Sequence, residues 1–311
     1  TMSRDFYRAF EDKFRRSRET IRSRLLFYRP LLEGLVTHTS SREAIDLGCG
    51  RGEWLECLQD LGFACKGVDL DAGMLQACRA IDLPVQEQDA LAALRTLPSE
   101  SMALVSAFHL VEHMPFDQVL ELIQESHRVL VPGGLLMMET PNSENLGVGT
   151  WNFYLDPTHQ KPIPHLLLEF SAQFGGFEFT RIMRVNEDKQ LASQQEPGLL
   201  DVLCRTSPDY AVITVKARND AKTVEDVFGD FLSKPHGISL EMLADRYDDK
   251  YSGAIRTLDA ELFALRAELT SMRQAEEKFL QQFVNDEESE SGLSLEKFAR
   301  THRAIASRLD H

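Results

Sequence analysis

The chain has 311 residues and a mass of 35.3 kDa, enough for one large domain or for a core domain with an appended segment. Hydrophobic residues make up 43% and charged residues 27%, which is typical of globular proteins and excludes wholesale disorder. The 49 acidic residues outnumber the 34 basic ones and give a net charge of −15, so the composition argues against a nucleic-acid partner.

Residues 3–30 have the spacing of an amphipathic helix, with apolar side chains that include Phe14, Ile21 and Leu25. Nine basic residues against four acidic ones make this segment positive within an acidic chain. A solvated helix face is the ordinary interpretation of such a run. The alternative hypothesis is a helical lid, over residues 1–35, that faces an anion.

From Ala44 to about Ala217, short apolar segments alternate with segments of helical spacing. This alternation predicts an α/β domain over residues 36–218, with a mostly parallel sheet covered by helices on both faces. Residues 186–208 are interpreted as a loop-rich insertion, and a hairpin there would make the final strand antiparallel. The predicted strands are Ala44–Leu47, Cys65–Leu70, Val85–Gln88, Ala103–Phe108, Leu135–Glu139, Phe177–Arg184 and Tyr210–Ala217. The predicted helices include Trp54–Leu61, Met74–Ile81 and Gln118–Leu130, the last of them ended by Pro132-Gly133-Gly134.

After Arg218 the pattern changes to a helical extension over residues 219–311. Apolar residues recur there at intervals of three and four, with Glu276 at the one polar position. The spacing predicts a coiled coil at about 251–283, and a long helix folded back on the core is the alternative. The apolar positions are Ile255, Leu258, Leu262, Leu265, Leu269, Met272, Phe279 and Phe283. Residues 285–292 interrupt the pattern, and a second helix with Phe298, Ile305 and Leu309 on one side is expected to follow.

A glycine-rich segment, Asp46-Leu47-Gly48-Cys49-Gly50-Arg51-Gly52, joins the first predicted strand to the next helix. Its glycines permit a tight turn and close approach of a ligand, and the free amides at the helix start favour a polar or negative ligand group. Glycine spacing alone also fits a dinucleotide-binding loop. With an acidic residue inside the preceding strand, the segment resembles class I S-adenosylmethionine-dependent methyltransferases over about residues 14–217. The resemblance implies a Rossmann-like, seven-stranded α/β fold and S-adenosylmethionine as cofactor.

The resemblance also implies which residues bind the cofactor. The glycines would pass under its methionine part, Asp46 would hold the ammonium group, and Asp69 would accept hydrogen bonds from both ribose hydroxyls. Met74 would lie against adenine, and the Asp89-Ala90 turn would bind the adenine amino group. A helix cap is the ordinary role of Asp46 or Asp69 taken singly. The full set is Asp46, Gly48, Gly50, Gly52, Asp69, Leu70, Met74, Asp89, Ala90 and Phe108, with Arg18, preferred to Arg15, on the methionine carboxylate.

The fourth predicted strand runs into Phe108-His109-Leu110-Val111-Glu112-His113, at the sheet edge where open α/β folds bind ligands. His109, Glu112 and His113 are candidate catalytic residues, because deprotonation of a hydroxyl acceptor needs a group that titrates near neutrality. The letters His-x-x-Glu-His also fit an inverted zinc-protease motif, but Pro115 argues against the long helix that this motif needs. Some ubiquinone-pathway O-methyltransferases bind a divalent ion here through Glu-x-x-Glu-His. In this chain His109 stands in the place of the first Glu, so a metal ion is not favoured. For His109 a structural role is the alternative to a catalytic one.

A long polar and aromatic segment follows the fifth predicted strand and includes Glu139-Thr140-Pro141-Asn142 and residues 152–159. A loop of this length at the carboxyl end of a strand is typical of ligand binding. Together with the histidine segment, it resembles a bacterial subfamily of surface-polysaccharide methyltransferases that includes the methyltransferase domains of O-antigen chain terminators. The resemblance implies a sugar hydroxyl as acceptor. His159 is then a second candidate base, and Asn142, Tyr154 and Asp156 are candidate substrate-binding residues, for which turn stabilisation is the alternative role.

These features predict an S-adenosylmethionine-dependent O-methyltransferase that acts on a sugar hydroxyl of a bacterial surface polysaccharide or its precursor, free or lipid-linked. The alternatives are a small-molecule methyltransferase, acting on a quinone precursor, phenol or nucleotide sugar, and a catalytically silent scaffold. The coiled coil is expected to join copies of the chain or to bind a glycosyltransferase. Five unpaired cysteines, a charged beginning and the lack of a long apolar run predict a cytoplasmic protein without a transmembrane segment, placed at the inner membrane only through a partner.

Overall fold

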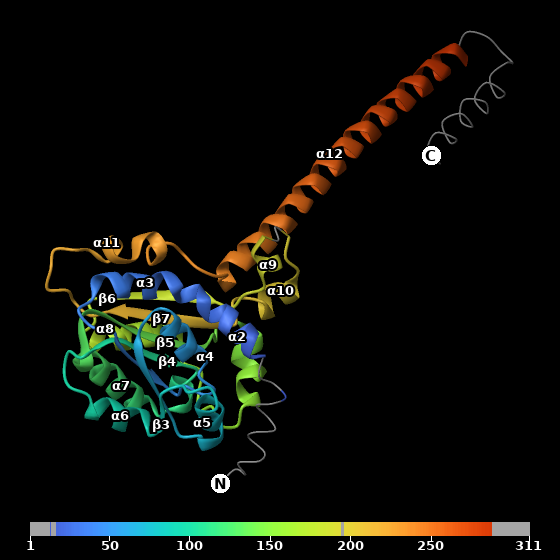
Figure 1. Cartoon of the computed structure of the whole chain (residues 1–311). Coiled ribbons are helices and arrows are strands. Elements are labelled where there is room, and N and C mark those ends of the chain that lie inside the picture. Colours follow the sequence, from blue (N-terminus) through green and yellow to red (C-terminus); the bar gives the residue numbers. More distant parts are fainter. Residues whose placement is uncertain (1–12, 14–16, 194–195, 288–311) are drawn as a thin grey trace. The chain divides into compact units, whose positions relative to one another are not determined.

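The structure is a computed structural model and describes residue 13 and residues 17–193 and 196–287. Two compact units make up the chain, residues 1–247 and residues 248–311. The first unit contains a seven-stranded sheet with the strand order β3-β2-β1-β4-β5-β7-β6 (Figure 1). The strands are β1 (Glu43–Leu47), β2 (Ala64–Asp69), β3 (Val85–Glu87), β4 (Met102–Phe108), β5 (Leu130–Pro141), β6 (Phe179–Val185) and β7 (Asp209–Val215).

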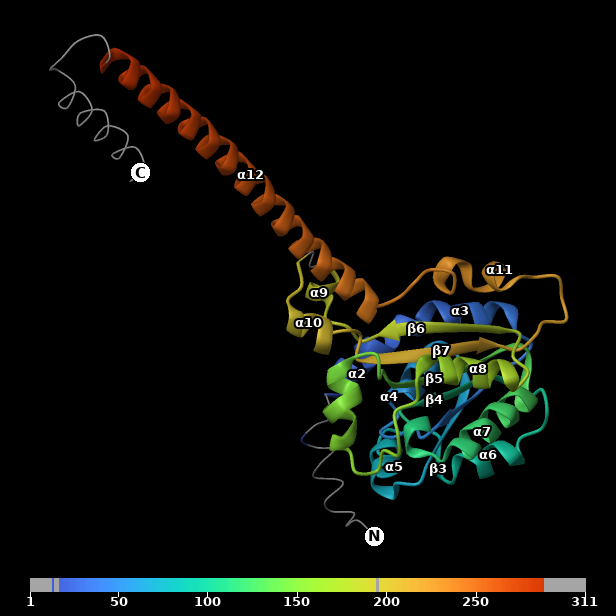
Figure 2. The ribbon, with the colours of Figure 1, turned by 180° about the vertical axis from the view of Figure 1, so that it is seen from behind.

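The sheet is parallel except at β7, which pairs antiparallel with both β5 and β6. The prediction of a mostly parallel sheet whose final strand is antiparallel is therefore confirmed. Helices cover both faces, with α3 and α4 on one and α6, α7 and α8 on the other (Figures 1 and 2). The helices of the first unit are α2 (Arg18–Leu25), η1 (Leu26–Tyr28), α3 (Arg29–His38), α4 (Glu53–Asp60), α5 (Ala72–Arg79), α6 (Ala90–Thr96), η2 (Val111–His113), α7 (Phe116–Val129), η3 (Val148–Asn152), η4 (Phe153–Leu155), α8 (His165–Phe174), α9 (Lys189–Ser193), α10 (Leu199–Cys204), α11 (Val224–Phe228) and η5 (Gly229–Phe231).

Two hydrophobic cores lie on opposite faces of the sheet, because successive side chains of a strand point to opposite sides. On β4, Leu104 joins the core under α3 and α4, whereas Val105 joins the core under α6 and α7. On β5, Leu135 and Leu136 divide in the same way. This double burial explains why these strands are continuous apolar runs instead of alternating ones.

Polar caps decide where the helices beside the ligand-binding edge begin. Asp71 accepts hydrogen bonds from the amides of Gly73 and Met74, so α5 begins at Ala72, two residues before the predicted start. Asp89 accepts a hydrogen bond from the amide of Ala92 and starts α6. Both caps directly follow the carboxyl ends of β2 and β3, and they fix the turns on which the predicted cofactor residues lie.

Three local predictions are wrong. Residues 186–208 contain the helices α9 and α10 instead of a loop-rich insertion, because Leu191 and Val202 find an apolar cluster with Ile238 and Leu243. Pro132-Gly133-Gly134 does not end α7, which stops at Val129; these residues lie inside β5, where the pairing with β4 shifts register. The predicted helix over 3–30 is not continuous where it is described, since the short η1 separates α2 from α3; residues 1–12 and 14–16, with Arg15, lie outside the described residues.

The longest helix, α12 (Leu240–Glu287), begins in the first unit and makes up the described part of the second. It contains all of the segment for which the heptad spacing predicts a coiled coil. The predicted second helix, with Phe298, Ile305 and Leu309, lies outside the described residues. Within the residues that the structure describes, no helix combines the length and apolarity needed to cross a membrane.

Candidate active site

The glycine-rich segment forms a loop between β1 and α4 at the carboxyl end of the sheet. Gly48, Gly50 and Gly52 all have positive φ, at 69°, 52° and 79°, a region that favours glycine. A Cβ atom on Gly52 would lie 2.4 Å from Leu83, so a side chain there would displace the packing under the loop. The loop is therefore a tight turn that depends on its glycines, and its contact with a ligand stays a prediction.

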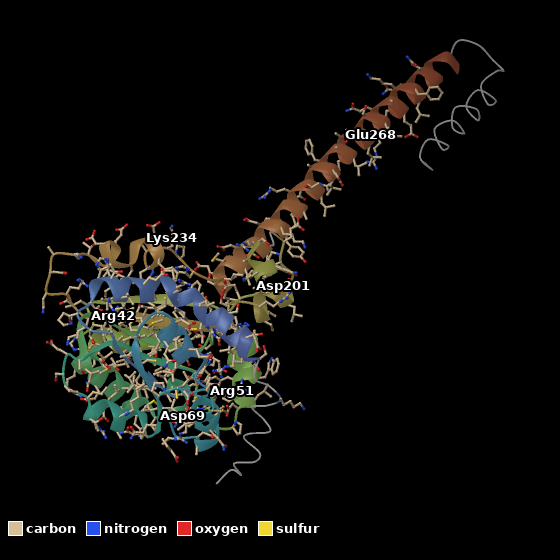
Figure 3. All side chains as sticks on the ribbon, in the orientation of Figure 1. Arg42, Arg51, Asp69, Asp201, Lys234 and Glu268 are labelled. Atoms are coloured by element: carbon tan, nitrogen blue, oxygen red, sulfur yellow. The ribbon has the colours of Figure 1, made fainter. Side chains whose placement is uncertain are left out.

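Asp69, at the end of β2, is bound to this loop. One carboxylate oxygen accepts a hydrogen bond of 2.9 Å from the amide of Gly50, and the other accepts one of 2.8 Å from the amide of Asp71. Each oxygen keeps a further lone pair for a ligand hydroxyl. Figure 3 shows Asp69 and Arg51 at the same end of the sheet. This arrangement can hold a diol and fix the loop at the same time.

Asp46, inside β1, is a buried carboxylate with 3% exposure. Burial raises its pKa to about 7, while the hydroxyl of Ser106, which donates at 2.7 Å, opposes the rise. Trp54 donates in turn to Ser106 at 3.0 Å and holds that hydroxyl in place. Among the described residues Asp46 forms no ion pair. A cationic ligand group beside the glycine loop would supply the missing countercharge.

The remaining predicted cofactor residues surround the same sheet edge. Met74 and Ala90 lie in the first turns of α5 and α6, Asp89 caps α6, and Leu70 is 66% exposed after β2. Phe108, at the end of β4, packs against the rings of Tyr28 and Trp54, which also contact each other.

Arg18, on α2, also reaches the glycine loop. It donates to the carbonyl of Arg51 at 2.8 Å and to the carboxylate of Glu56 at 2.7 Å. Its position agrees with the lid hypothesis, but both contacts use guanidinium donors that the hypothesis assigns to a ligand carboxylate. In the described structure Arg18 fastens α2 to the loop.

His109 lies in the left-handed region, with φ of 52°, which is uncommon for a residue with a side chain. Its two ring nitrogens are 3.3 Å from Glu112 and 3.5 Å from Glu139. Burial opposes the charged form, but hydrogen bonds to these carboxylates hold the pKa of His109 well above its usual value. The side chain of His109 is 48% exposed. A protonated His109 is a fixed cation and a poor general base.

Glu112 is 1% exposed and is paired with this cation. Burial favours its neutral form, but the hydrogen bond and charge of His109 outweigh burial and lower the pKa of Glu112. Thr140 donates to its second oxygen at 2.9 Å. Glu112 is thus an ionised carboxylate whose charge is already balanced, and it orients the segment that carries His113.

His113 lies at the end of η2 and is held by a chain of side-chain hydrogen bonds. Its Nδ1 is 2.8 Å from the hydroxyl oxygen of Thr158, and that hydroxyl donates to Asp156 at 2.6 Å. Because the one hydroxyl proton goes to Asp156, Thr158 accepts from His113, so the neutral ring carries its proton on Nδ1. Nε2 then has a free lone pair. Burial lowers the pKa of His113, so this lone pair is available at neutral pH.

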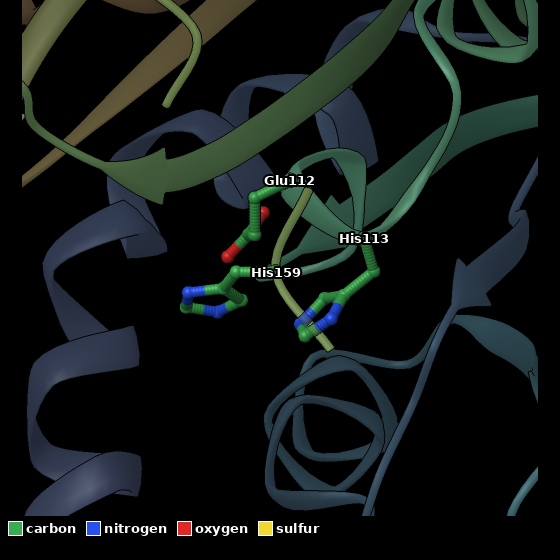
Figure 4. A group of neighbouring side chains, drawn as sticks. All are labelled: Glu112, His113 and His159. Atoms are coloured by element: carbon green, nitrogen blue, oxygen red, sulfur yellow. The ribbon is translucent and has the colours of Figure 1, made fainter. Parts of the chain in front are cut away.

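His159 lies beside His113, with ring centroids 4.6 Å apart (Figure 4). Its Nδ1 is 2.6 Å from the carbonyl oxygen of Phe153, which can only accept, so Nδ1 is a donor. Figure 4 shows Glu112, His113 and His159 gathered at one place although they come from two segments. The structure therefore brings both predicted base candidates together.

The predicted substrate-binding residues are placed differently from one another. Tyr154 is 58% exposed on η4 and can contact a ligand. Asn142 is 1% exposed; its amide donates to Ser207 and accepts from Glu144, which supports the structural alternative for this residue. Asp156 accepts from both the amide and the hydroxyl of Thr158 and supports His113 through it.

Among the residues that the structure describes, two groups of side chains offer ligand atoms for a metal ion within 4.8 Å of one another. One is Glu112, His113 and His159, and the other is His109, Glu139 and Asp209.

Sequence reasoning missed Thr158 and Glu139 as functional residues. Thr158 is adjacent to His159, but its contact with His113 spans 45 positions, and nothing in the local sequence marks it. Glu139 receives hydrogen bonds from Tyr28 at 2.5 Å and Asn186 at 2.9 Å, so the network behind His109 joins three distant segments. Its place at the end of a predicted strand, one strand over from His109, was the available signal.

Comparison with known proteins agrees with this geometry. A family described as "Methyltransferase domain" matches residues 14–178, just over half of the chain. A probable S-adenosylmethionine-dependent methyltransferase of Mycolicibacterium smegmatis is 28% identical over 144 residues, which are 46% of this chain and 55% of that protein. A ubiquinone biosynthesis O-methyltransferase of Paraburkholderia xenovorans is 26% identical over 113 residues, 34% of this chain and 47% of that protein. The chain thus spans about half the length of these relatives.

A solved structure, the S-adenosylmethionine-dependent methyltransferase from Archaeoglobus fulgidus, superimposes with a TM-score of 0.60 at 29% identity. The match covers 68% of this chain and all of the other.

Proposed function

The chain belongs to the methyltransferase domain family, and from this premise we propose that it transfers the methyl group of S-adenosylmethionine to a hydroxyl oxygen of its acceptor. The observation that carries the proposal is the orientation of His113, whose Nε2 lone pair is left free by the contacts with Thr158 and Asp156. A Cβ atom on Gly48 would lie 3.1 Å from Leu110, so the glycine loop borders the segment that carries His113.

The residues of the glycine-loop side fit the cofactor. Its ammonium group matches the buried Asp46, and its ribose diol matches the two oxygens of Asp69. The positive-φ loop leaves room for the methionine part. When bound, S-adenosylmethionine supplies an electrophilic methyl carbon on a positively charged sulfur.

On the acceptor side, His113 takes the proton of the acceptor hydroxyl on Nε2 as the oxygen attacks. Thr158 and Asp156 keep the ring oriented and stabilise the imidazolium that forms, because the Nδ1 proton stays hydrogen-bonded throughout. His159, whose Nδ1 is fixed by Phe153, packs beside the first ring, and its Nε2 lies 4.0 Å from a carboxylate oxygen of Asp156. Alignment of the acceptor oxygen with the methyl carbon lowers the activation barrier, because two reactants held in place react in an effectively unimolecular step.

For the acceptor we propose a sugar hydroxyl of a bacterial surface polysaccharide or its precursor. The polar loop with Tyr154 and the similarity of the histidine and loop segments to surface-polysaccharide methyltransferases support this choice. An aliphatic hydroxyl is only weakly acidic, and it needs the oriented base that His113 provides. The second candidate is a phenolic quinone precursor. It is favoured by the ubiquinone O-methyltransferase relatives and by the exposed Trp151 and Leu155 beside Tyr154.

A direct test measures methyl transfer from S-adenosylmethionine to two acceptor panels, envelope oligosaccharides and catechol-type phenols. The demethylated cofactor and the methylated product are both quantified by mass spectrometry. Turnover of an oligosaccharide that depends on His113 supports the proposal. Turnover of phenols alone would show that the acceptor is a phenol and not a sugar. Absence of cofactor binding in calorimetry would contradict the whole assignment.

A further inference from the structure

An apolar stripe on α12 is not covered within the described residues. Its side chains are between 45% and 63% exposed, although leucine and isoleucine bury well and contribute most when removed from water. The stripe consists of Ile255, Leu258, Leu262, Leu265 and Leu269. These positions recur at alternating intervals of three and four, which puts them on one side of a helix as the a and d positions of heptads.

Charged residues flank the stripe in a regular order. With Ile255 at position a, Glu261 and Glu268 occupy position g, and Arg266 and Arg273 occupy position e. None of these four side chains has an ion pair among the described residues. Figure 3 shows the side chain of Glu268 on α12. Glutamates thus border the g side of the stripe at two successive heptads and arginines the e side, where Asp259 in the preceding heptad is the one acidic residue.

This order is complementary to itself in one orientation. In a parallel, in-register pair of helices, each g residue faces the e residue five positions later on the second helix. Glu261 then faces Arg266 of the second copy, and Glu268 faces Arg273 of the second copy. An antiparallel pair would place g beside g and e beside e, so glutamates would meet glutamates and arginines would meet arginines. The charges therefore favour the parallel arrangement.

We propose that α12 pairs with α12 of a second copy of the chain in a parallel, in-register, two-stranded coiled coil over residues 251–283. Leucine at the d positions Leu258 and Leu265 is typical of two strands, as is the β-branched Ile255 at the first a position, which Leu262 and Leu269 follow at the next two. Glu276, alone at a polar a position, reduces packing at one level and penalises shifted registers in which it would face an apolar residue. The pairing is independent of the proposed function.

The first experiment reverses the charges in the full-length chain. Light scattering should give twice the chain mass of 35.3 kDa for the wild type. Glu261→Lys with Glu268→Lys should raise the dimer dissociation constant about tenfold or more, because four attractive contacts become repulsive. Arg266→Glu with Arg273→Glu should do the same. An equal mixture of the two variants should form heterodimers, in which every g and e pair is again opposite in charge.

A matched control changes the same charge at outward positions. Asp249→Lys with Glu277→Lys adds the same four units of positive charge at b positions and should leave the dimer unchanged. Loss of the dimer in this control would mean that net charge, not the g and e contacts, governs association. A monomeric wild type at micromolar concentration would overturn the proposal.

The second experiment tests orientation by disulfide formation. Leu258→Cys, in a Cys204→Ser background that removes the exposed native thiol, should cross-link under mild oxidation, because identical d residues are adjacent in a parallel pair. In an antiparallel pair centred on residue 267, the two thiols would be about 27 Å apart along the helix axis. Arg256→Cys, at an outward b position, is the control and should not cross-link.

Residues 288–311 are the other occupant that the chain itself offers for the stripe. A chain ending at Glu287 should therefore remain dimeric with an unchanged dissociation constant. If this truncated chain dimerises and the full chain does not, residues 288–311 cover the stripe and the proposal is wrong.

Discussion

The glycine-loop side and the histidine side of the site are built in different ways. The glycine-loop side is shaped mainly by the backbone. Its loop has three positive-φ glycines, and Asp69 accepts hydrogen bonds from two main-chain amides. On the histidine side, side chains hold side chains, as His113 is fixed by Thr158 and Asp156. The backbone geometry of the loop is determined by residues that are neighbours in the sequence. The side-chain contact between Thr158 and His113 joins segments that are 45 positions apart.

The difference separates two kinds of defect. A change on the glycine-loop side should weaken cofactor binding, whereas a change on the histidine side should slow turnover with cofactor affinity intact.

The largest effect is expected for His113→Ala. Removal of a general base typically lowers a rate by about 10²- to 10⁴-fold. Cofactor affinity, measured by calorimetry, should stay unchanged, because the ring of His113 is held by Thr158 and packs against His159. His159→Ala is the companion variant. If it removes turnover while His113→Ala retains it, the roles of the two rings are exchanged.

Asp69→Ala should weaken cofactor binding by about 30-fold, equivalent to about 2 kcal/mol, because a carboxylate that accepts from two hydroxyls is lost. The free energy of unfolding should also fall, since two backbone amides lose their acceptor. Asp71→Ala is the matched control: it removes the cap of α5 and should cost about 1 kcal/mol of stability with little change in affinity. Equal affinity losses in both variants would reduce Asp69 to a structural residue.

The sequence predicts the first side far better than the second. Glycines after a buried strand, with carboxylates on two neighbouring strands, specify the tight loop and the place of Asp69 beside it within a few residues. The histidine segment is found by its position after β4, and the structure then divides its members: the half-exposed His109 and the buried Glu112 balance one another in an ion pair, which leaves His113. That division depends on Glu139, on the next strand, and Thr158 becomes visible only when the chain is folded.

Thr158→Val tests the hydrogen-bonded series His113, Thr158 and Asp156. The substitution keeps the shape of the side chain but removes the hydroxyl that accepts from His113, so Nδ1 loses its partner and the ring loses its fixed tautomer. Turnover should fall about fivefold, the value of roughly 1 kcal/mol for one hydrogen bond. Thr158→Ser should restore turnover. An unchanged pH–rate profile in the valine variant would show that His113 does not depend on this contact.

The smallest and most specific effect concerns Asp46, whose buried carboxyl has a pKa of about 7. It must lose its proton before it pairs with the ammonium group of the cofactor, so the affinity for the cofactor should rise from pH 5.5 to 7.5 and level off above.

The raised pKa of Asp46 acts on the stability of the protein with the opposite sign. The folded state binds the proton more tightly than the unfolded state, in which an aspartate titrates at about 3.9. Stability from this group is therefore full below that value and falls as pH rises through 7. Asp46→Asn removes both dependences: its affinity should be low and flat with pH, while its melting temperature relative to wild type should increase between pH 5 and pH 8. A melting difference that does not grow with pH would show that Asp46 is ionised in the free protein, and the buried carboxylate would then already have the countercharge that this site reserves for its ligand.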